Sequence, residues 1–204
     1  MNIGIIGTGR IATALAQRWL ETGHSVLLGS RDAGKAAAVA AELGGAAQGG
    51  GYQQAVDFGE VIVLTTPWEA TEETLRGLTG LAGKVLLETT NKLRDPRPET
   101  STELIARWAA GAKVVKAFNT VFAQIIATPP ADRKFQADVF VVGDDAEAKA
   151  TVTTLVHDAG FSAIDAGGVA NARHVENLAA FIITLGYGSG WGTGISYKIV
   201  QVAP

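Results

Sequence analysis

Short apolar runs alternate with segments of helical periodicity along most of this chain. The runs are 2–6, 24–28, 61–65, 84–88, 113–118 and 138–142, and all are rich in Val, Leu, Ile or Phe. Strands with such continuous apolar character are typical of a parallel sheet that is covered by helices on both faces. The helical segments between them can supply this cover, since one places Ile11, Leu15 and Trp19 four residues apart on one face. The alternation predicts an α/β fold with a doubly wound parallel sheet.

The pattern changes near residue 143, and we expect two structural units. Residues 1–143 carry the strand and helix repeats, while 144–204 hold a helix, a short strand at 161–165, an apolar helix at 169–185 and a glycine-rich tail. Two helix starts are marked by capping residues: Thr100 with Glu103 has the form of a capping box, and Asp144 or Asp145 can cap the helix that follows. The second unit is expected to be a small C-terminal α/β lobe.

The composition excludes several classes of protein. Of 204 residues, 47% are hydrophobic and 18% are charged, which allows a buried core and argues against disorder. The net charge of −3 disfavours binding to nucleic acid or to an acidic membrane. No cysteine is present, which excludes disulfides, thiol catalysis and Cys-ligated metals. With no signal-peptide pattern and no apolar run of about 18 residues, we expect a soluble cytoplasmic protein.

A glycine-rich turn follows the first strand directly. Residues 7–12 read Gly-Thr-Gly-Arg-Ile-Ala, a G-x-G-x-x-A pattern that opens an amphipathic helix. In such a turn Gly7 permits the sharp bend, Gly9 lets a pyrophosphate approach the backbone, and Ala12 allows close packing of helix and strand. The free N–H groups of the helix then face the phosphates. The alternative is a glycine-rich turn that binds nothing. The position after a buried strand favours a dinucleotide site, and therefore a Rossmann sheet.

The end of the second strand indicates which dinucleotide binds. An NAD site usually has an acidic residue there, whereas this chain has Ser30 and Arg31, with Lys35 one helical turn further on. Serine can donate a hydrogen bond to a 2′-phosphate and arginine can bind it with two N–H groups, while an acidic side chain would repel it. The alternative is a solvated pair of basic residues at a helix start. We interpret the pattern as specific for NADP(H).

The other strand ends carry few groups suited to acid–base catalysis. They read Thr65-Thr66-Pro67-Trp68, Thr89-Thr90-Asn91-Lys92 and Ala117-Phe118-Asn119-Thr120, without a histidine or a pair of carboxylates, and Lys116 lies within its strand. His24, His157 and His174 lack the spacing of metal ligands, so no metal site is expected. Carbonyl reduction needs a proton donor, but hydride transfer between two rings needs mainly stacking and exclusion of water. The second substrate is therefore expected to be a ring cofactor.

Several motifs together resemble the NADP-dependent oxidoreductases of the deazaflavin coenzyme F-420 and the dinucleotide-binding proteins grouped with them. They are the turn at 5–9, Gly29-Ser30-Arg31-Asp32, Lys116-Ala117-Phe118-Asn119-Thr120, Val142-Gly143-Asp144-Asp145, Asp165-Ala166-Gly167 and Asn171-Ala172-Arg173 with Glu176. The resemblance implies hydride transfer between NADPH and a deazaflavin stacked in a cleft between the two units, in a homodimer. Residues expected to bind NADP are Gly7, Thr8, Gly9, Arg10, Ile11, Ser30, Arg31, Lys35, Thr66, Pro67, Trp68, Asn91 and Asn119. Those expected at the acceptor are Arg173, Gly190 and Trp191, with no catalytic side chain.

The chain departs from the family pattern in ways that leave the acceptor open. Lys92 stands where relatives often have proline, 95–99 is rich in proline and charge, and 186–194 is unusually dense in glycine. The acceptor could thus be an ordinary flavin, a quinone or an iron chelate. A small imine or keto reductase, or an NADP(H)-binding sensor without turnover, are further alternatives. Trp68 could equally be core packing, and Arg173 a surface residue. The glycines at 44–51 are expected to form a loop.

Overall fold

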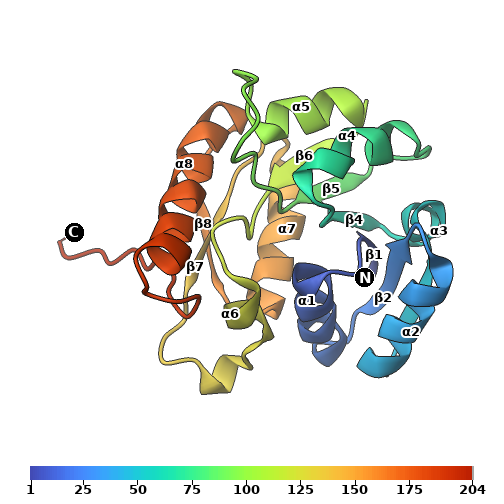
Figure 1. Ribbon diagram of the computed structural model, residues 1–204, viewed down its shortest axis with the longest axis horizontal. Coiled ribbons are helices and arrows are strands. Elements are labelled where there is room, and N and C mark those ends of the chain that lie inside the picture. The colour runs from blue at the N-terminus through green and yellow to red at the C-terminus, as the bar shows by residue number, and fades with distance from the viewer. Residues whose placement is uncertain (204) are drawn as a thin grey trace.

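Six parallel strands form the main sheet of this computed structural model, which describes residues 1–203. Their order is β3-β2-β1-β4-β5-β6 (Figure 1). The strands are β1 (Asn2–Ile6), β2 (Ser25–Ser30), β3 (Ala47–Gly51), β4 (Val61–Leu64), β5 (Val85–Glu88) and β6 (Lys113–Lys116). Every neighbouring pair is parallel. This order is that of the Rossmann fold, so the predicted doubly wound sheet is confirmed.

Helices cover both faces of this sheet. They are α1 (Arg10–Glu21), α2 (Ala33–Leu43), α3 (Tyr52–Phe58), α4 (Trp68–Arg76), α5 (Ser101–Trp108) and α7 (Ala146–Asp158). Because side chains alternate along a strand, Ile5 packs with α1 and α7 on one face while Ile6 packs with α3, α4 and α5 on the other. The predicted caps are also found: Thr100 and Glu103 form a capping box on α5, and Asp145 caps α7.

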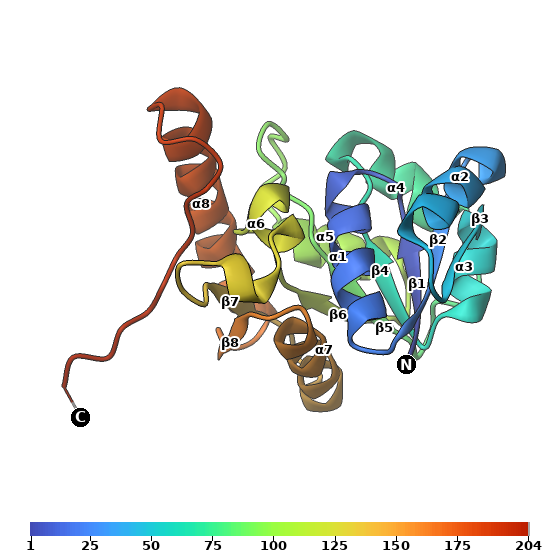
Figure 2. The same ribbon diagram turned by 90° about the horizontal axis from the view of Figure 1, so that it is seen from below.

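The C-terminal lobe is built on a second, smaller sheet. Its two parallel strands are β7 (Asp138–Val141) and β8 (Ser162–Asp165), so 138–142 does not join the main sheet as the apolar pattern suggested. An antiparallel bridge between Lys116 and Val142 connects the two sheets. The remaining elements are α6 (Ala123–Ala127), the short 3-10 turns Pro130–Asp132 and Val169–Asn171, α8 (Ala172–Ile183) and a π-helical turn at Thr184–Gly188. Beyond them the tail extends away from α8 (Figure 2).

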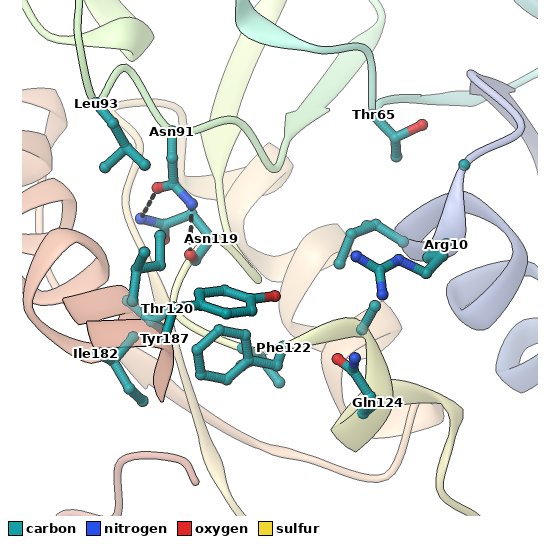
Figure 3. A pocket seen from close by; sticks show the side chains of 15 residues that line it. Arg10, Thr65, Asn91, Leu93, Asn119, Thr120, Phe122, Gln124, Ile182 and Tyr187 are labelled. Carbon is teal, nitrogen blue, oxygen red and sulfur yellow. Dashed lines mark hydrogen bonds between the residues drawn. The ribbon is translucent and has the colours of Figure 1, made fainter. Parts of the chain in front are cut away.

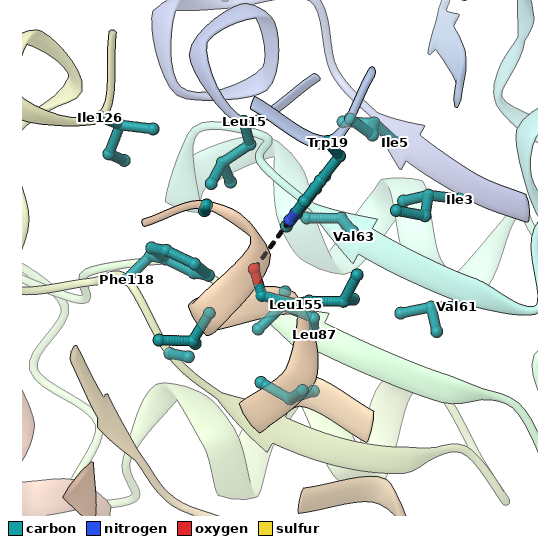
Figure 4. Packing of buried hydrophobic residues seen from close by; sticks show 14 of the residues in the cluster. Ile3, Ile5, Leu15, Trp19, Val61, Val63, Leu87, Phe118, Ile126 and Leu155 are labelled. Atoms are coloured by element: carbon teal, nitrogen blue, oxygen red, sulfur yellow. Dashed lines mark hydrogen bonds between the residues drawn. The ribbon is translucent and has the colours of Figure 1, made fainter. Parts of the chain in front are cut away.

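The two lobes share one hydrophobic core. Trp19 of α1 is fully buried, and its indole N–H donates to the carbonyl of Leu155 in α7 at 2.9 Å (Figure 4). The ring of Phe118, just past β6, packs edge-on against Trp19 and Phe161 at 6.3 and 5.9 Å. On the opposite side of the small sheet, α8 packs on Phe140. Among residues 1–203, no helix has the length and apolar character needed to cross a membrane.

The glycine-rich stretch 44–51 contains a strand, so the expected loop was wrong. β3 pairs with β2 along its whole length, and α3 follows it directly. The reason for the glycines is steric: a Cβ on Gly49 would lie 2.3 Å from the backbone of Ala36, so α2 could not lie this close to a strand with side chains. The strand is held by its ladder to β2 and by helix contact, with little contribution from β-propensity.

Candidate functional site

The turn between β1 and α1 has the geometry that binding of a pyrophosphate needs. Gly7 has φ +130°, and a Cβ there would lie 2.3 Å from the hydroxyl of Thr65. Gly9 precedes α1, and no side chain caps the helix at this point. Ala12 is fully buried against the sheet. The first turn of α1 carries no acidic residue, so its N–H groups and the positive end of its dipole are available to an anion.

Basic side chains lie at the end of β2, as expected for a 2′-phosphate. Arg31 and Lys35 are exposed, and neither forms an ion pair within the part of the chain that the structure describes. Asp32 is occupied locally, since its carboxylate accepts from the backbone N–H of Lys35 at 3.1 Å and caps α2. Ser30 ends the strand, and its hydroxyl accepts from the N–H of Asp32. Arg31 borders a hollow of about 310 Å³ beside α3 and α4.

A cleft of about 410 Å³ opens between the strand ends and the C-terminal lobe (Figure 3). It is lined by five parts of the chain: 9–11 in the glycine turn, Thr65 after β4, Asn91 and Leu93 after β5, 119–124 after β6, and Ile182, Ile183 and Tyr187 at the end of α8. The structure thus brings together Gly9, Arg10, Ile11, Asn91 and Asn119 of the predicted NADP site. The carboxyl ends of parallel strands meet at this edge, which is where ligands bind in such sheets.

The floor of the cleft is polar and incompletely hydrogen-bonded. The amide of Asn91 donates to the carbonyl of Asn119 at 2.9 Å, and the amide of Asn119 donates to the side-chain oxygen of Asn91 at 3.2 Å and to the carbonyl of Val175 at 3.3 Å. Asn119 Oδ1 and Thr120 Oγ1 are buried without a partner in the protein. Buried polar atoms normally have one, so these two atoms distinguish the floor from the rest of the lining.

Phe118 directly precedes the floor residues Asn119 and Thr120 and has an unusual backbone conformation. It has φ +62°, a conformation that non-glycine residues rarely adopt, and its buried ring anchors it in the core. The reversed backbone direction at Phe118 places the two following residues, Asn119 and Thr120, along the cleft. Strain of this kind persists where packing enforces it, often beside a functional site.

The opposite wall is apolar and aromatic. Phe122 packs edge-on against Tyr187 with ring centroids 5.7 Å apart, next to Ile182 (Figure 3). Tyr187 lies on the π-helical turn that extends α8, and such turns are frequent at functional sites. Gly186 makes the contact possible, because a Cβ there would lie 2.8 Å from the ring of Phe122. The wall therefore suits a flat, apolar ring.

Beneath the floor lies a buried charge network that does not reach the cleft. Lys116 Nζ is 2.7 Å from Glu88 Oε1, both side chains are fully buried, and Glu176 of α8 is 3.7 Å away. The hydroxyl groups of Thr90 and Thr102 also donate to Glu88, while that of Ser101 lies 3.1 Å from Glu88 and donates to Glu176 at 2.7 Å. Burial raises the pKa of Glu88, but Lys116 and these hydrogen bonds outweigh it and hold the pKa below its ordinary value. The network is fully paired and leaves no free acid or base.

The ionisable side chains that line the cleft are those of Arg10 and Tyr187. Neither a carboxylate nor a histidine is present among its lining residues. General acid–base catalysis uses these groups most often, and a tyrosine hydroxyl such as that of Tyr187 can also act as a proton donor. The rest of the lining is suited to holding and aligning planar groups.

Several predicted site residues lie elsewhere. Trp68 packs on Trp108 at 5.4 Å and donates to Asp95 at 2.8 Å, while the hydroxyl of Thr66 bonds to that of Thr71. Pro67 precedes α4, and neither it nor these two residues line the cleft. Gly7 and Thr8 form the turn behind it.

Of the residues predicted at the acceptor, Arg173 lies at a neighbouring cavity. Trp191 is 67% exposed, and neither Trp191 nor Gly190 lines the cleft. Residues missed from the sequence are Thr65, Leu93, 120–124, Ile182, Ile183 and Tyr187. A signal existed for three of them: Thr65 and Thr120 belong to the strand ends at 65–68 and 117–120, and Tyr187 stands among the tail glycines.

Comparison with known proteins finds similarity to several reductases. Residues 2–92 match the family described as NADP oxidoreductase coenzyme F420-dependent. The chain is 34% identical over 180 residues to Metalloreductase STEAP3 of Rattus norvegicus, covering 87% of this chain and 36% of that protein. It therefore spans little more than a third of the metalloreductase.

Two further relatives match along most of their length. The F420-dependent NADP reductase of Methanothermobacter marburgensis is 29% identical in an alignment of 210 positions, which covers 91% of this chain and 92% of the relative. A crystal structure from Arthrobacter sp. FB24, provisionally described as an F420-dependent NADP-reductase, has a TM-score of 0.85 at 28% identity, over 98% of this chain and all of that one. The resemblance inferred from the motifs is confirmed.

Proposed function

We propose that the protein transfers hydride between NADP(H) and a planar acceptor of the deazaflavin or flavin type, in keeping with the match of residues 2–92 to the F420-dependent NADP oxidoreductase family. The observation that carries the proposal is the cleft itself, which combines a polar floor with two unpartnered buried atoms, an aromatic wall and a lining without carboxylate or histidine. The kinship with NADP-dependent reductases along 91% of the chain supports the same conclusion.

The residues present fit an NADP cofactor. The N–H groups at the start of α1 would hold the pyrophosphate, and Ser30, Arg31 and Lys35 would hold the 2′-phosphate. The unpartnered Oδ1 of Asn119 and Oγ1 of Thr120 match the amide of a nicotinamide, which offers both a donor and an acceptor. When bound, NADPH supplies the hydride.

The chain's own contribution is alignment and exclusion of water. Phe122 and Tyr187 present ring faces and edges to an acceptor, and Leu93 with Ile182 closes the apolar side. Reaction between two stacked rings requires reacting atoms about 3–3.5 Å apart, which a shaped cleft can impose. Because no proton has to be delivered to a carbonyl oxygen, the absence of a carboxylate or histidine from the lining is consistent with this chemistry.

The exposed apolar side chains near the C-terminus support the further proposal of a homodimer. Phe181, Trp191 and Val202 are 56%, 67% and 92% exposed, and they lie on α8 and the tail that follows it. Large exposed apolar side chains such as these become buried where two subunits meet. Sedimentation equilibrium should give twice the chain mass if it is one.

Stopped-flow oxidation of NADPH tests the proposed activity. The deazaflavin, FMN, FAD and a ferric chelate are offered in turn, and at least one of the ring acceptors should accelerate the loss of NADPH absorbance. NADPH binding without acceleration by any acceptor would instead make the protein a sensor of NADP(H). A response to the ferric chelate alone would contradict a ring acceptor.

A substitution at the end of β2 tests the choice of cofactor. Arg31→Ala is expected to raise the KM for NADPH about tenfold, the effect of losing one charge-assisted hydrogen bond at an exposed site. The KM for NADH should not change. Arg76→Ala, which removes an exposed arginine on α4, serves as the control. An unchanged KM for NADPH would remove the basis for the NADP assignment.

A further inference from the structure

A second cavity adjoins the cleft behind Asn91 and Leu93. It measures about 300 Å³ and lies between the loop 92–99 and α8, and Asn91 and Leu93 line both spaces. A ring held against the aromatic wall of the cleft could therefore extend a substituent past Leu93 into this second space. In contrast to the cleft, the cavity is mainly polar, with charged side chains from both of its walls.

Most charged side chains around this cavity are already engaged by other groups of the protein. Arg97 pairs with Asp95 and with Glu72, Glu99 pairs with Arg107 at 2.9 Å, and Glu176 accepts from the backbone and hydroxyl of Ser101. The ammonium group of Lys92 donates to two backbone carbonyls of the loop and lies 3.9 Å from the carboxylate of Asp95. These groups hold the loop in shape rather than offering themselves to a ligand.

Arg173 is the exception. Its side chain is exposed, it forms no ion pair within residues 1–203, and its one hydrogen bond there is a 3.1 Å contact from Nη2 to the carbonyl of Pro98. Arg173 also lies close enough to Glu103 to help lower the pKa of that carboxyl, but the carboxylate is engaged by the N–H and hydroxyl of Thr100. The other carboxylates that line the cavity are those of Glu99 and Glu176. Asn177, one turn further along α8, lines the same cavity. A guanidinium with spare donors and an amide four residues later can bind an oxyanion together.

We propose that this cavity binds a phosphate group carried on the side chain of the acceptor whose ring occupies the cleft, with Arg173 as the main ligand and Asn177 as a second donor. The inference rests on the proposed function and narrows its substrate to phosphorylated flavins or deazaflavins. Arg173 acts here as a residue that determines specificity. It takes no part in hydride transfer, so it should affect acceptor binding without changing the chemical step.

Flavin fluorescence titration of the NADP⁺-saturated protein compares FMN with riboflavin, which has the same ring and lacks the phosphate. FMN should bind about tenfold more tightly than riboflavin, since one charge-assisted hydrogen-bond pair is gained, and the advantage should shrink with added salt. Arg173→Gln should remove the advantage while leaving the Kd of riboflavin unchanged. Arg94→Gln removes a charge from an exposed residue of the same loop that does not line the cavity, and it should keep the advantage.

Three results would overturn the inference. The first is equal affinity for FMN and riboflavin, and the second is that neither flavin binds. The third is an equal loss of affinity for both flavins in Arg173→Gln, which would mean that Arg173 only supports the loop through its hydrogen bond to Pro98. Competition by inorganic phosphate with equal flavin affinities would point to a free-ion site and also overturn it. Reduction rates judge the proposed function separately: turnover of riboflavin without a preference for FMN keeps the function and rejects the phosphate site.

Discussion

Replacing Lys116 by methionine removes the cation that lies 2.7 Å from the buried carboxylate of Glu88. Methionine has a similar volume, so the substitution leaves packing largely intact. It removes the charge together with the 2.9 Å hydrogen bonds from Nζ to the carbonyl of Thr90 and the hydroxyl of Ser101, and only the charge makes the loss depend on pH. In the wild-type protein burial raises the pKa of Glu88, while Lys116 and the hydrogen bonds of Thr90 and Thr102 lower it by more, so the folded pKa lies below the ordinary value of 4.5. The pair therefore contributes stability above about pH 4.5, and this contribution is lost as the pH falls through the folded pKa.

In Lys116→Met the sign of this dependence reverses. Burial then dominates, and the folded pKa of Glu88 rises above its unfolded value. The free energy of unfolding now falls as the pH rises, by about 1.4 kcal/mol for each pH unit over which the folded carboxyl keeps its proton. From pH 5 to pH 7 the additional loss is about 2.7 kcal/mol. At pH 7 the total approaches the roughly 3–5 kcal/mol expected when one partner of a buried ion pair is removed.

Urea denaturation at pH 5, 6 and 7 measures this loss relative to wild type. Lys113→Met is the matched control, because Lys113 lies on the same strand and pairs with Asp145 at 3.0 Å with both side chains about one-third exposed. It should change the free energy of unfolding by less than about 1 kcal/mol at every pH. A loss in Lys116→Met that is the same at pH 5 and pH 7, or below about 1 kcal/mol throughout, would refute the reasoning.

Two glycines allow similarly direct tests. Gly7→Ala should lower the affinity for NADPH at least tenfold and destabilise the fold by about 2 kcal/mol, because φ is +130° and the new Cβ would lie 2.3 Å from the hydroxyl of Thr65. Calorimetric titration measures the affinity and urea denaturation measures the stability. An unchanged affinity for NADPH would contradict a role for the turn. Gly186→Ala should weaken acceptor binding several-fold with NADPH affinity unchanged, since its Cβ would lie 2.8 Å from the ring of Phe122, whereas Gly188→Ala, with its nearest atom at 3.7 Å, should bind normally. Equal behaviour of the two tail variants would remove Phe122 from the acceptor wall.

The parts of the fold that could be predicted are those with a local cause. Buried parallel strands need continuous apolar runs, and the glycine turn needs φ > 0 at Gly7, so both are written into short stretches of sequence. The Thr100–Glu103 and Asp145 caps are local in the same sense. Asn91 and Asn119 could be placed because any residue that follows a strand of a parallel sheet reaches the same edge.

The parts that could not be predicted depend on contacts between distant segments. The strand at Ala47–Gly51 has the composition of a loop and exists because α2 lies against it and β2 offers a free edge. Tyr187 reaches the cleft because a π-helical turn redirects the end of α8, and no periodicity in the sequence predicts that turn. Trp68 stands next to a strand end, yet its indole is drawn towards Trp108 and Asp95 by a loop that departs from the family pattern.

The buried charge network and the cleft are connected through α8. Glu176 joins α8 to Ser101 and lies 3.7 Å from Lys116, while Ile182 and Ile183 at the far end of the same helix line the cleft. The distance between the floor after β5 and β6 and the apolar wall is therefore influenced by charges that lie outside the cleft. Hydride transfer tolerates little error in that distance. Because α8 is held near one end by the buried ion pair and at the other end by aromatic packing, the cleft has a fixed width. The glycine turn that would hold the phosphates follows β1 and does not depend on the position of α8.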